Sequence, residues 1–297
     1  MKVIKTKSLK GTKIPFRYPG GKFYALRIIE KFWESVKHDE YREPFVGGGS
    51  VFFAKPKVPH NWLNDRHEDL IITYKILADP NLRLKLVDML SKELASKERH
   101  SEVLSMKPKN DLERAFRYFY LNRTSFSGKM KAPSWGYRPK RSLPPNRWKE
   151  RIIPCGEKLE KVKLTSLDFE EVIKAPEVGK KILFFLDPPY FSAKQESHYY
   201  CPFVKEDHFR LEKLLRNLHH SFFLTYDDTP EINNLYNWAY IYPIKFFYRL
   251  DNSQQNKGKR KMGFELVITN FKLGKEIQQK LSNVILAKNG ENGNGSS

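Results

Sequence analysis

Short apolar runs, each ended by glycine, proline or a polar residue, alternate along this chain with stretches of helical periodicity. Runs of this length suit buried strands, and their alternation with helices is typical of a sheet covered by helices. Leu82, Leu86, Leu90 and Leu94 recur at every fourth position, as on the buried side of a helix. The pattern predicts strands at 42–46, 61–65, 161–167, 182–186, 221–226, 239–250 and 264–271, and helices from Ser50, across 82–94, at 111–122 and at 205–218.

This pattern predicts an α/β fold with a doubly wound, mostly parallel sheet. The last two strands flank a polar loop at 251–263 and should form an antiparallel hairpin. Between about 70 and 160 the alternation gives way to helical, proline-rich sequence. We therefore expect one domain from 1–70 and 160–287, a helical insertion at 71–159, and a disordered tail rich in Gly, Asn and Ser at 288–297.

The run 182–186 is followed by Asp187, Pro188, Pro189 and Tyr190. Proline cannot donate to a sheet, so the strand must stop there and present a carboxylate, a carbonyl and a ring at its carboxyl end. Ligands of open α/β sheets bind at that edge. Such a corner can accept two hydrogen bonds from a planar amino group while the ring stacks on its face. The plain alternative is a strand followed by a surface turn.

The formal net charge of +20 is unevenly distributed. Residues 1–29 contain eight Lys or Arg and no acid, and residues 114–149 contain ten and no acid. Such segments indicate a polyanionic partner, and the aromatic residues of the second segment suit stacking on unpaired bases. Nucleic acid is favoured over an acidic membrane, because the prolines between 133 and 145 prevent a long amphipathic helix.

Composition also excludes several classes of protein. No apolar run reaches about 18 residues, and the basic N-terminus lacks the apolar region of a secretory signal. Cys155 and Cys201 have no paired or metal-ligand spacing, and the eight histidines are scattered. We expect a cytoplasmic, monomeric protein without a bound metal.

A glycine-rich turn, Pro44-Phe45-Val46-Gly47-Gly48-Gly49, follows the first strand. Glycines there let a ligand approach the backbone closely. The turn matches neither the dinucleotide fingerprint nor the phosphate-binding loop of ATPases. Asp65 ends the next strand, where a carboxylate can bind the hydroxyls of a ribose, with a helix cap as the alternative.

These motifs, in this order, resemble those of S-adenosylmethionine-dependent DNA adenine-N6 methyltransferases of the Dam-like (D12) class. The resemblance covers most of the chain. Residues 16–22, Phe-Arg-Tyr-Pro-Gly-Gly-Lys, resemble the N-terminal motif of the family, and 44–49 its cofactor loop. Asn64-Asp65 is similar to its ribose-binding segment, Asp168-Phe169 to the pair that holds the cofactor adenine, and 187–190 to its catalytic motif.

The resemblance implies a Rossmann-like class I methyltransferase fold with S-adenosylmethionine as cofactor. For Lys22 the resemblance leaves two binding partners open, the cofactor carboxylate or a DNA phosphate. Asp168 would bind the cofactor adenine, or else serve only as a helix cap. The implied cofactor-binding residues are Tyr18, Gly20, Lys22, Pro44, Phe45, Gly47, Gly49, Asp65, Asp168, Phe169 and Asp187.

The implied catalytic residues are Asp187, Pro188, Pro189 and Tyr190. The lone pair of the adenine amino nitrogen is delocalised into the ring. Hydrogen bonds to the Asp187 carboxylate and the Pro188 carbonyl would favour a pyramidal nitrogen, with the methyl group in line at about 3–3.5 Å. Tyr190 would stack on a base flipped out of duplex DNA, and Asp187 would accept the proton only after attack.

Residues 122–131 resemble the recognition hairpin of the family. In GATC-methylating members an Asn stands at the position of Ser127 and an Arg at that of Lys131, so GATC is not predicted as the target. Arg123 is a candidate for a guanine edge, or else a phosphate, and Phe126 for a wedge, or else core packing. The expected DNA-binding residues are Arg17, Arg123, Phe126, Ser127, Lys131 and Tyr137.

Other functions remain possible on the sequence alone. The same fold can serve a methyltransferase of RNA adenine or of a protein amide, although amide-modifying relatives usually carry Asn in place of Asp187. A DNA-binding module without activity is a further alternative. The favoured interpretation is a site-specific DNA adenine methyltransferase of bacterial or phage origin, acting at the nucleoid.

Overall fold

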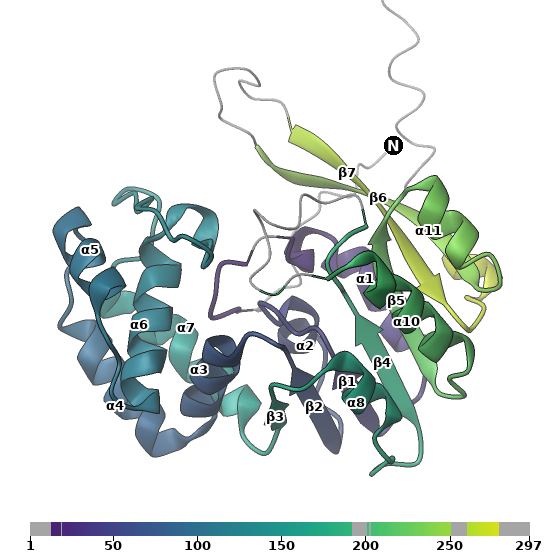
Figure 1. The fold of residues 1–297 in the computed structure, drawn as a ribbon, viewed down its shortest axis with the longest axis horizontal. Helices are drawn as coiled ribbons and strands as arrows, with labels where there is room; N and C mark the ends of the chain where they lie inside the picture. The colour runs from purple at the N-terminus through teal and green to yellow at the C-terminus, as the bar shows by residue number, and fades with distance from the viewer. Residues whose placement is uncertain (1–12, 19, 192–200, 202, 251–259, 279–297) are drawn as a thin grey trace, which may run out of the picture.

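The computed structural model describes residues 13–18, 20–191, 201, 203–250 and 260–278, so the expected tail at 288–297 lies outside the described residues. Seven strands of this part form one sheet in the order β3-β2-β1-β4-β5-β7-β6 (Figure 1). Neighbouring strands are parallel except β7, which is antiparallel to β5 and β6. The strands are β1 (Glu40–Glu43), β2 (His60–Asn64), β3 (Lys163–Thr165), β4 (Ile182–Leu186), β5 (Ser221–Asp227), β6 (Tyr240–Leu250) and β7 (Arg260–Thr269).

Helices cover both faces of this sheet, which confirms the doubly wound α/β fold and the C-terminal antiparallel hairpin. The α-helices are α1 (Leu26–Glu34), α2 (Ser50–Ala54), α3 (Glu68–Ala78), α4 (Pro80–Ser91), α5 (Lys97–Ser105), α6 (Asp111–Thr124), α7 (Lys149–Leu159), α8 (Phe169–Lys174), α10 (Lys205–Arg216) and α11 (Pro230–Leu235). Short 3₁₀ helices are η1 (Lys22–Tyr24), η2 (Phe126–Gly128) and η3 (Pro145–Arg147).

The central strand β4 is buried along its whole length. Successive side chains of a strand point to opposite faces, so Leu183 and Phe185 pack with α1, α2 and the helices α3 to α7. Phe184 and Leu186 pack on the other face with α8, α10 and α11. The apolar run therefore reflects a strand with helices on both sides, as predicted.

The predicted helical insertion consists of α3 to α7 with η2 and η3. Its core is continuous with one face of the sheet, since Leu77, Phe119 and Trp148 belong to the same apolar cluster as Phe185. The expected boundary at residue 70 falls inside α3, whereas the boundary at 159 coincides with the end of α7.

Several element bounds differ from the prediction for local reasons. β1 ends at Glu43 rather than at 46, because Pro44 has no N–H to donate. Leu94 is 77% exposed, because α4 ends at Ser91 and the four-residue spacing no longer keeps it on the buried side. The strand expected at 161–167 is shorter, and β7 begins within the loop expected at 251–263. No helix of the described ranges is both long and apolar enough to cross a membrane.

Candidate active site

A cleft opens where the strand order reverses between β1 and β4, the position at which open α/β sheets bind ligands. The cleft is open to solvent, and its empty space, the open part included, is about 880 Å³. Its walls come from the glycine turn after β1, from the corner after β4, and from the segment before η1. Predicted residues lining it are Tyr18, Gly20, Lys22, Phe45, Gly47, Gly49, Asp65, Asp187, Pro188, Pro189 and Tyr190.

The glycine turn is held against Tyr18. A Cβ atom on Gly47 or Gly48 would lie 2.8 or 2.7 Å from atoms of this side chain, so only glycine fits. Gly47 and Gly49 also have φ values of +47° and +66°, which disfavour any other residue. Gly49, rather than Ser50, is the cap residue of α2, and the Ser50 hydroxyl accepts from the Lys22 N–H instead.

Asp65 ties this turn to the end of β2. Its carboxylate accepts hydrogen bonds from the backbone N–H of Gly47 and of His67, both at 2.9 Å. Burial raises the pKa of Asp65, and the two N–H groups oppose that rise. The cap position of α3 is His67, so Asp65 is not the helix cap that the sequence left as an alternative.

The corner after β4 centres on the Asp187 carboxylate. Lys22 Nζ lies 2.6 Å from Oδ1 and 2.8 Å from Oδ2, and the Thr225 hydroxyl donates to Oδ1 at 2.7 Å. The Lys22 ammonium also lies 4.9 Å from the centre of the Tyr190 ring. Lys22 thus pairs with the acid of the Asp-Pro-Pro-Tyr corner, a partner that neither interpretation of its role anticipated.

Two further acids beside this corner are buried, and the sequence analysis assigned them no role. Glu43 lines the cleft, accepts from the Tyr41 hydroxyl at 3.1 Å, and has a pKa raised well above its ordinary value by burial. Glu265 of β7 lies 3.8 Å from Lys22 Nζ. Glu265 interrupts the apolar run 264–268, and this departure is the sequence signal that marks it, whereas Glu43 ends the polar strand Glu40–Glu43 and has no such signal.

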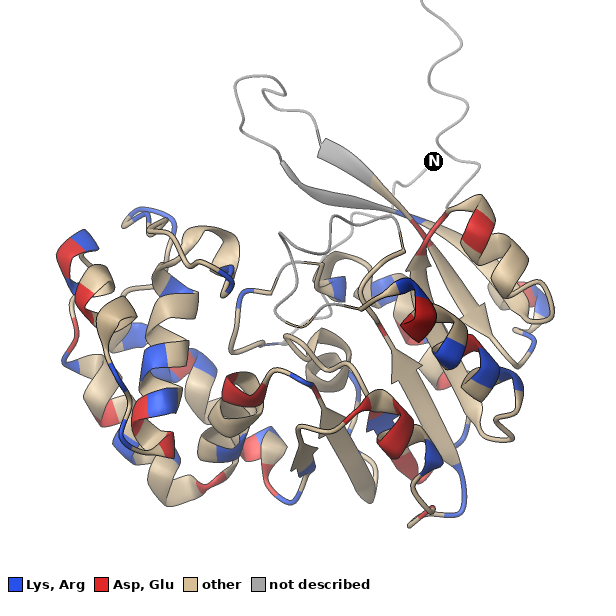
Figure 2. Cartoon of the chain, in the orientation of Figure 1, with Lys and Arg blue, Asp and Glu red and all other residues tan. Residues whose placement is uncertain are grey.

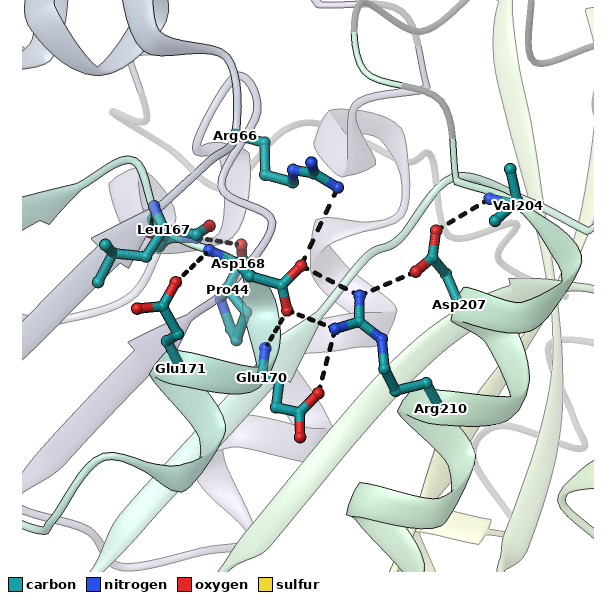
Figure 3. Close-up of polar contacts among 10 residues, drawn as sticks. Pro44, Arg66, Leu167, Asp168, Glu170, Glu171, Val204, Asp207 and Arg210 are labelled. Atoms are coloured by element: carbon teal, nitrogen blue, oxygen red, sulfur yellow. Dashed lines mark hydrogen bonds and ion pairs between the residues drawn. The ribbon is translucent and has the colours of Figure 1, made fainter.

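The Asp168-Phe169 pair does not line the cleft. Asp168 caps α8 in a capping box with Glu171, as its alternative interpretation held, and its two oxygens accept from Arg210 at 2.9 and 3.0 Å (Figure 3). Phe169 is buried behind the cleft-lining rings of Phe45 and Phe203. Phe203 is a cleft residue that the sequence analysis missed, and Pro44 also lies outside the lining.

The predicted recognition segment forms a tight turn at the end of α6. Ser125 pairs with Trp135 in a single antiparallel bridge, so the expected hairpin is reduced to its base. The Asn122 side chain accepts from the Arg17 N–H at 2.9 Å and donates to the Arg17 carbonyl at 2.8 Å. A Cβ atom on Gly128 would lie 2.5 Å from Arg17, so the N-terminal segment fixes this turn.

Arg123 is only 8% exposed, and its Nε has no hydrogen-bond partner among the described residues. Burial, together with the charges of Arg17 and Arg151, lowers the pKa of Arg123 to about 9. Burial also lowers the pKa of Arg17. A buried guanidinium beside two other cations attracts an anion, which favours the phosphate alternative over a guanine edge.

The other expected DNA-binding residues lie on the surface of the same turn. Phe126 is 53% exposed, so it does not pack in the core of the insertion. Ser127 and Lys131 are exposed, and Tyr137 is half-buried against Trp135. These side chains therefore remain available to a partner.

One group of three side chains of metal-ligating types occurs within the described part of the chain. Ligand atoms of Glu177, His219 and His220 lie within 4.8 Å of one another. Glu177 and His220 precede β4 and β5, so the group lies at the amino edge of the sheet, opposite the cleft. It therefore has no part in the chemistry of the Asp187 corner.

Residues 18–250 match the model of the D12 class N6 adenine-specific DNA methyltransferase family. A type II methyltransferase, M.CviBI, of Paramecium bursaria Chlorella virus NC1A is 27% identical over 80% of this chain and 92% of its own. The type II methyltransferase M1.LlaDCHI of Lactococcus lactis subsp. cremoris is 27% identical over 86% of this chain and 95% of its own.

A third relative is the DNA N-6-adenine-methyltransferase of Escherichia phage P1, 28% identical over 74% of this chain and 30% of its own. Among solved structures, a putative RNA methyltransferase from Pyrococcus horikoshii aligns over 89% of this chain and 91% of its own. The two chains are 9% identical, with a TM-score of 0.37.

Proposed function

Because the chain belongs to the family of D12 class N6 adenine-specific DNA methyltransferases, we propose that its cleft binds S-adenosylmethionine and presents the Asp187 corner to a target adenine. One observation carries this proposal: the glycine turn after β1 and the Asp-Pro-Pro-Tyr corner after β4 line a single cleft. Residues 1–70 and 160–287 then form the catalytic part, and residues 71–159 the target-recognition part.

The cleft fits this methyl donor in its chemistry. Asp65 offers carboxylate oxygens to the ribose hydroxyls, and Phe45 and Phe203 offer apolar faces to an adenine ring. Gly47 and Gly49 leave the backbone open to the ligand, and the segment with Tyr18 and Gly20 closes the opposite wall. When bound, the donor supplies an electrophilic methyl group on a sulfonium sulfur.

The remaining cofactor residues act from further away. Phe169 supports the rings of Phe45 and Phe203 from behind, and Pro44 places the turn over β2, since its carbonyl accepts from the Asn64 side chain at 3.0 Å. The Asp168 carboxylate is engaged by α8 and Arg210, so a contact with the adenine edge is secondary to its role as a cap.

The residues of the corner after β4 then have to make the lone pair of the adenine amino nitrogen available for attack on the methyl group. Asp187 and the Pro188 carbonyl accept its hydrogens, Pro189 keeps the corner rigid, and Tyr190 stacks on the base. After the nitrogen has gained the methyl group it carries one proton too many. Asp187 accepts that proton directly or through water, while Thr225 holds Oδ1 in place.

The DNA side of the site is the turn after α6. Figure 2 colours Lys and Arg positions along the ribbon of this turn blue, and Figure 1 places the turn on the side of the carboxyl ends of the strands. Arg17 and Arg123 contact phosphate oxygens, and Ser127, Lys131 and Tyr137 face the duplex. The N6 nitrogen is inaccessible within a duplex, so the adenine must leave the stack, and the exposed Phe126 ring fills its place.

Methylation of duplex DNA by the purified protein tests this proposal. Asp187→Ala should lower the single-turnover rate about 100-fold or more, because the amino group loses its acceptor. It should leave the affinity for S-adenosylhomocysteine within about threefold. Asp65→Ala should show the reverse, with a donor-binding defect. Mass spectrometry of digested DNA provides the readout.

Asp228→Asn is the matched control, because it removes one carboxylate charge from the exposed surface just after β5. Its rate and its donor affinity should equal those of the wild type. Wild-type protein that yields no N6-methyladenine, or calorimetry that shows tight binding of NAD and none of S-adenosylmethionine, would contradict the proposal.

A further inference from the structure

One buried acid beside the cleft has no part in the roles above. Glu265 is 4% exposed and lies in β7 opposite Asp227 of β5. Its Oε2 lies 3.8 Å from Lys22 Nζ and, among the described residues, takes part in no hydrogen bond. A glutamate is almost never fully buried unless it is paired, so this oxygen calls for a physical reason.

The position of Lys22 between Asp187 and Glu265 explains why Glu265 Oε2 has no hydrogen bond among the described residues. An ammonium group has three N–H donors. Around Lys22 Nζ lie Asp187 Oδ1 at 2.6 Å, Asp187 Oδ2 at 2.8 Å and the Gly20 carbonyl at 3.1 Å. These three oxygens all lie closer to the ammonium than Glu265 Oε2, which at 3.8 Å is beyond hydrogen-bond length.

This arrangement conflicts with the entry of a substrate. The inference rests on the proposed function, in which the adenine amino group donates to Asp187. Lys22 occupies both oxygens of that carboxylate, and Thr225 also holds Oδ1. An ionised carboxylate has about four acceptor positions, and three are in use, so the arriving amino group competes with the ammonium for Oδ2. A buried ammonium that loses its counter-ion is strongly destabilised.

We propose that Glu265 is a positioning residue that accepts the Lys22 ammonium when the target adenine takes its place on Asp187. A shift of about 1 Å would bring Nζ from the observed 3.8 Å to the length of a charge-assisted hydrogen bond. Lys22 stays paired throughout, Asp187 Oδ2 is released to the amino group, and no covalent bond is made or broken in this step.

The charges around Glu265 agree with this role. Burial raises the pKa of Glu265 and the charges of Asp187 and Asp227 raise it further, whereas the Lys22 charge and a hydrogen bond from the Tyr190 side chain to this carboxylate lower it. An ammonium that moves toward Glu265 therefore favours the ionised carboxylate that receives it. The Lys22 and Glu265 side chains are only 2% and 5% exposed, so water screens this exchange weakly.

A double-mutant cycle in the full-length protein tests the proposal. Glu265→Gln should lower the single-turnover methylation rate about 10- to 100-fold, because Lys22 remains on Asp187. The affinity for S-adenosylhomocysteine and the melting temperature should stay close to those of the wild type. In the Lys22→Met background the same substitution should cause no further loss of rate, because there is no ammonium for Glu265 to accept.

A second readout is independent of turnover. The complex of wild-type protein, S-adenosylhomocysteine and duplex DNA should bind a target adenine about tenfold more tightly than a purine without the amino group. Glu265→Gln should lose most of this preference. Glu231→Gln, which removes an exposed acid at the start of α11, is the matched control and should retain both rate and preference.

Two results would overturn the role of Glu265: a folded Glu265→Gln protein with wild-type rate and preference, or an equal fractional loss in the Lys22→Met background. If Glu265→Gln did not fold, Glu265→Asp would carry the same cycle with the same two criteria. A wild-type protein that forms no N6-methyladenine would instead overturn the proposed function itself, so the two failures are distinguishable.

Discussion

At the scale of single residues, one side chain can contribute to stability or to ligand binding. For Asp168, substitutions can distinguish these two contributions. Asp168 caps α8 and accepts two hydrogen bonds from Arg210. Asp168→Ala should lower the free energy of unfolding by about 1–2 kcal/mol, because the cap and a partly exposed ion pair are both lost. Urea denaturation provides the measurement.

Asp168→Asn is the informative partner of that variant. Asn is as good a cap as Asp, so this protein should recover most of the lost stability while it remains unable to pair with the Arg210 charge. If calorimetry showed a large loss of donor affinity in Asp168→Asn at unchanged stability, the carboxylate would hold the cofactor directly, as the family resemblance implies.

Single residues also account for much of what the sequence could and could not predict. Asp187 was predictable, because the strand before it is apolar and Pro188 forces the strand to end. The burial of Arg123 was not, because a basic residue near a helix end gives no local sign that Arg17 and Arg151 surround it. Glu265 and Lys22 lie close together in the fold but far apart in the sequence, so no local sequence pattern predicts their contact.

At the scale of elements, the turn η2 depends on a glycine. Gly128 has a φ of +71°, and a Cβ atom there would lie 2.5 Å from the Arg17 carbonyl and Cβ. Gly128→Ala should destabilise the protein by about 1–3 kcal/mol and displace the turn. DNA affinity should therefore fall more than donor affinity, as measured by fluorescence anisotropy and calorimetry.

The control for this substitution is Gly274→Ala, because a Cβ atom on Gly274 would meet nothing within 4 Å. That protein should bind DNA and donor as the wild type does. Equal losses of DNA and donor affinity in Gly128→Ala would show that the turn does not serve DNA alone.

Elements were predicted better at their centres than at their ends. The core of β4 followed from the apolar pattern, but the last residues of β1 and α4 depended on Pro44 and on where the packing partners of α4 stop. Leu94 illustrates this limit, since its spacing fits the helix and only the three-dimensional fold shows that the helix has already ended.

At the scale of the whole molecule, two buried histidines make stability depend on pH. Burial lowers the pKa of His67 and of His208 to about 4. The folded state therefore favours neutral imidazoles, and the stability that they contribute is complete above about pH 6.5 and is lost as the pH falls toward 4. Unfolding should become easier over that interval.

His208→Gln isolates one of these contributions. His208 Nδ1 and the Tyr226 hydroxyl form a hydrogen bond at 2.6 Å, and a glutamine amide can donate to or accept from that hydroxyl without titrating. The difference in unfolding free energy between pH 7 and pH 5 should be about 2 kcal/mol smaller in this variant. Thermal and urea unfolding at both pH values provide the test, and an unchanged difference would contradict it.

The adjacent residues Arg17 and Tyr18 have a consequence for how the binding of the methyl donor and the binding of DNA are coupled. Arg17 is clasped by Asn122 and Gly128 of the DNA side, and Tyr18 lies against Gly47 and Gly48 of the donor side. One peptide bond thus joins the two proposed substrate sites mechanically. If bound donor strengthens DNA binding through this link by some factor, then bound DNA must strengthen donor binding by the same factor, because the coupling free energy between two sites is reciprocal.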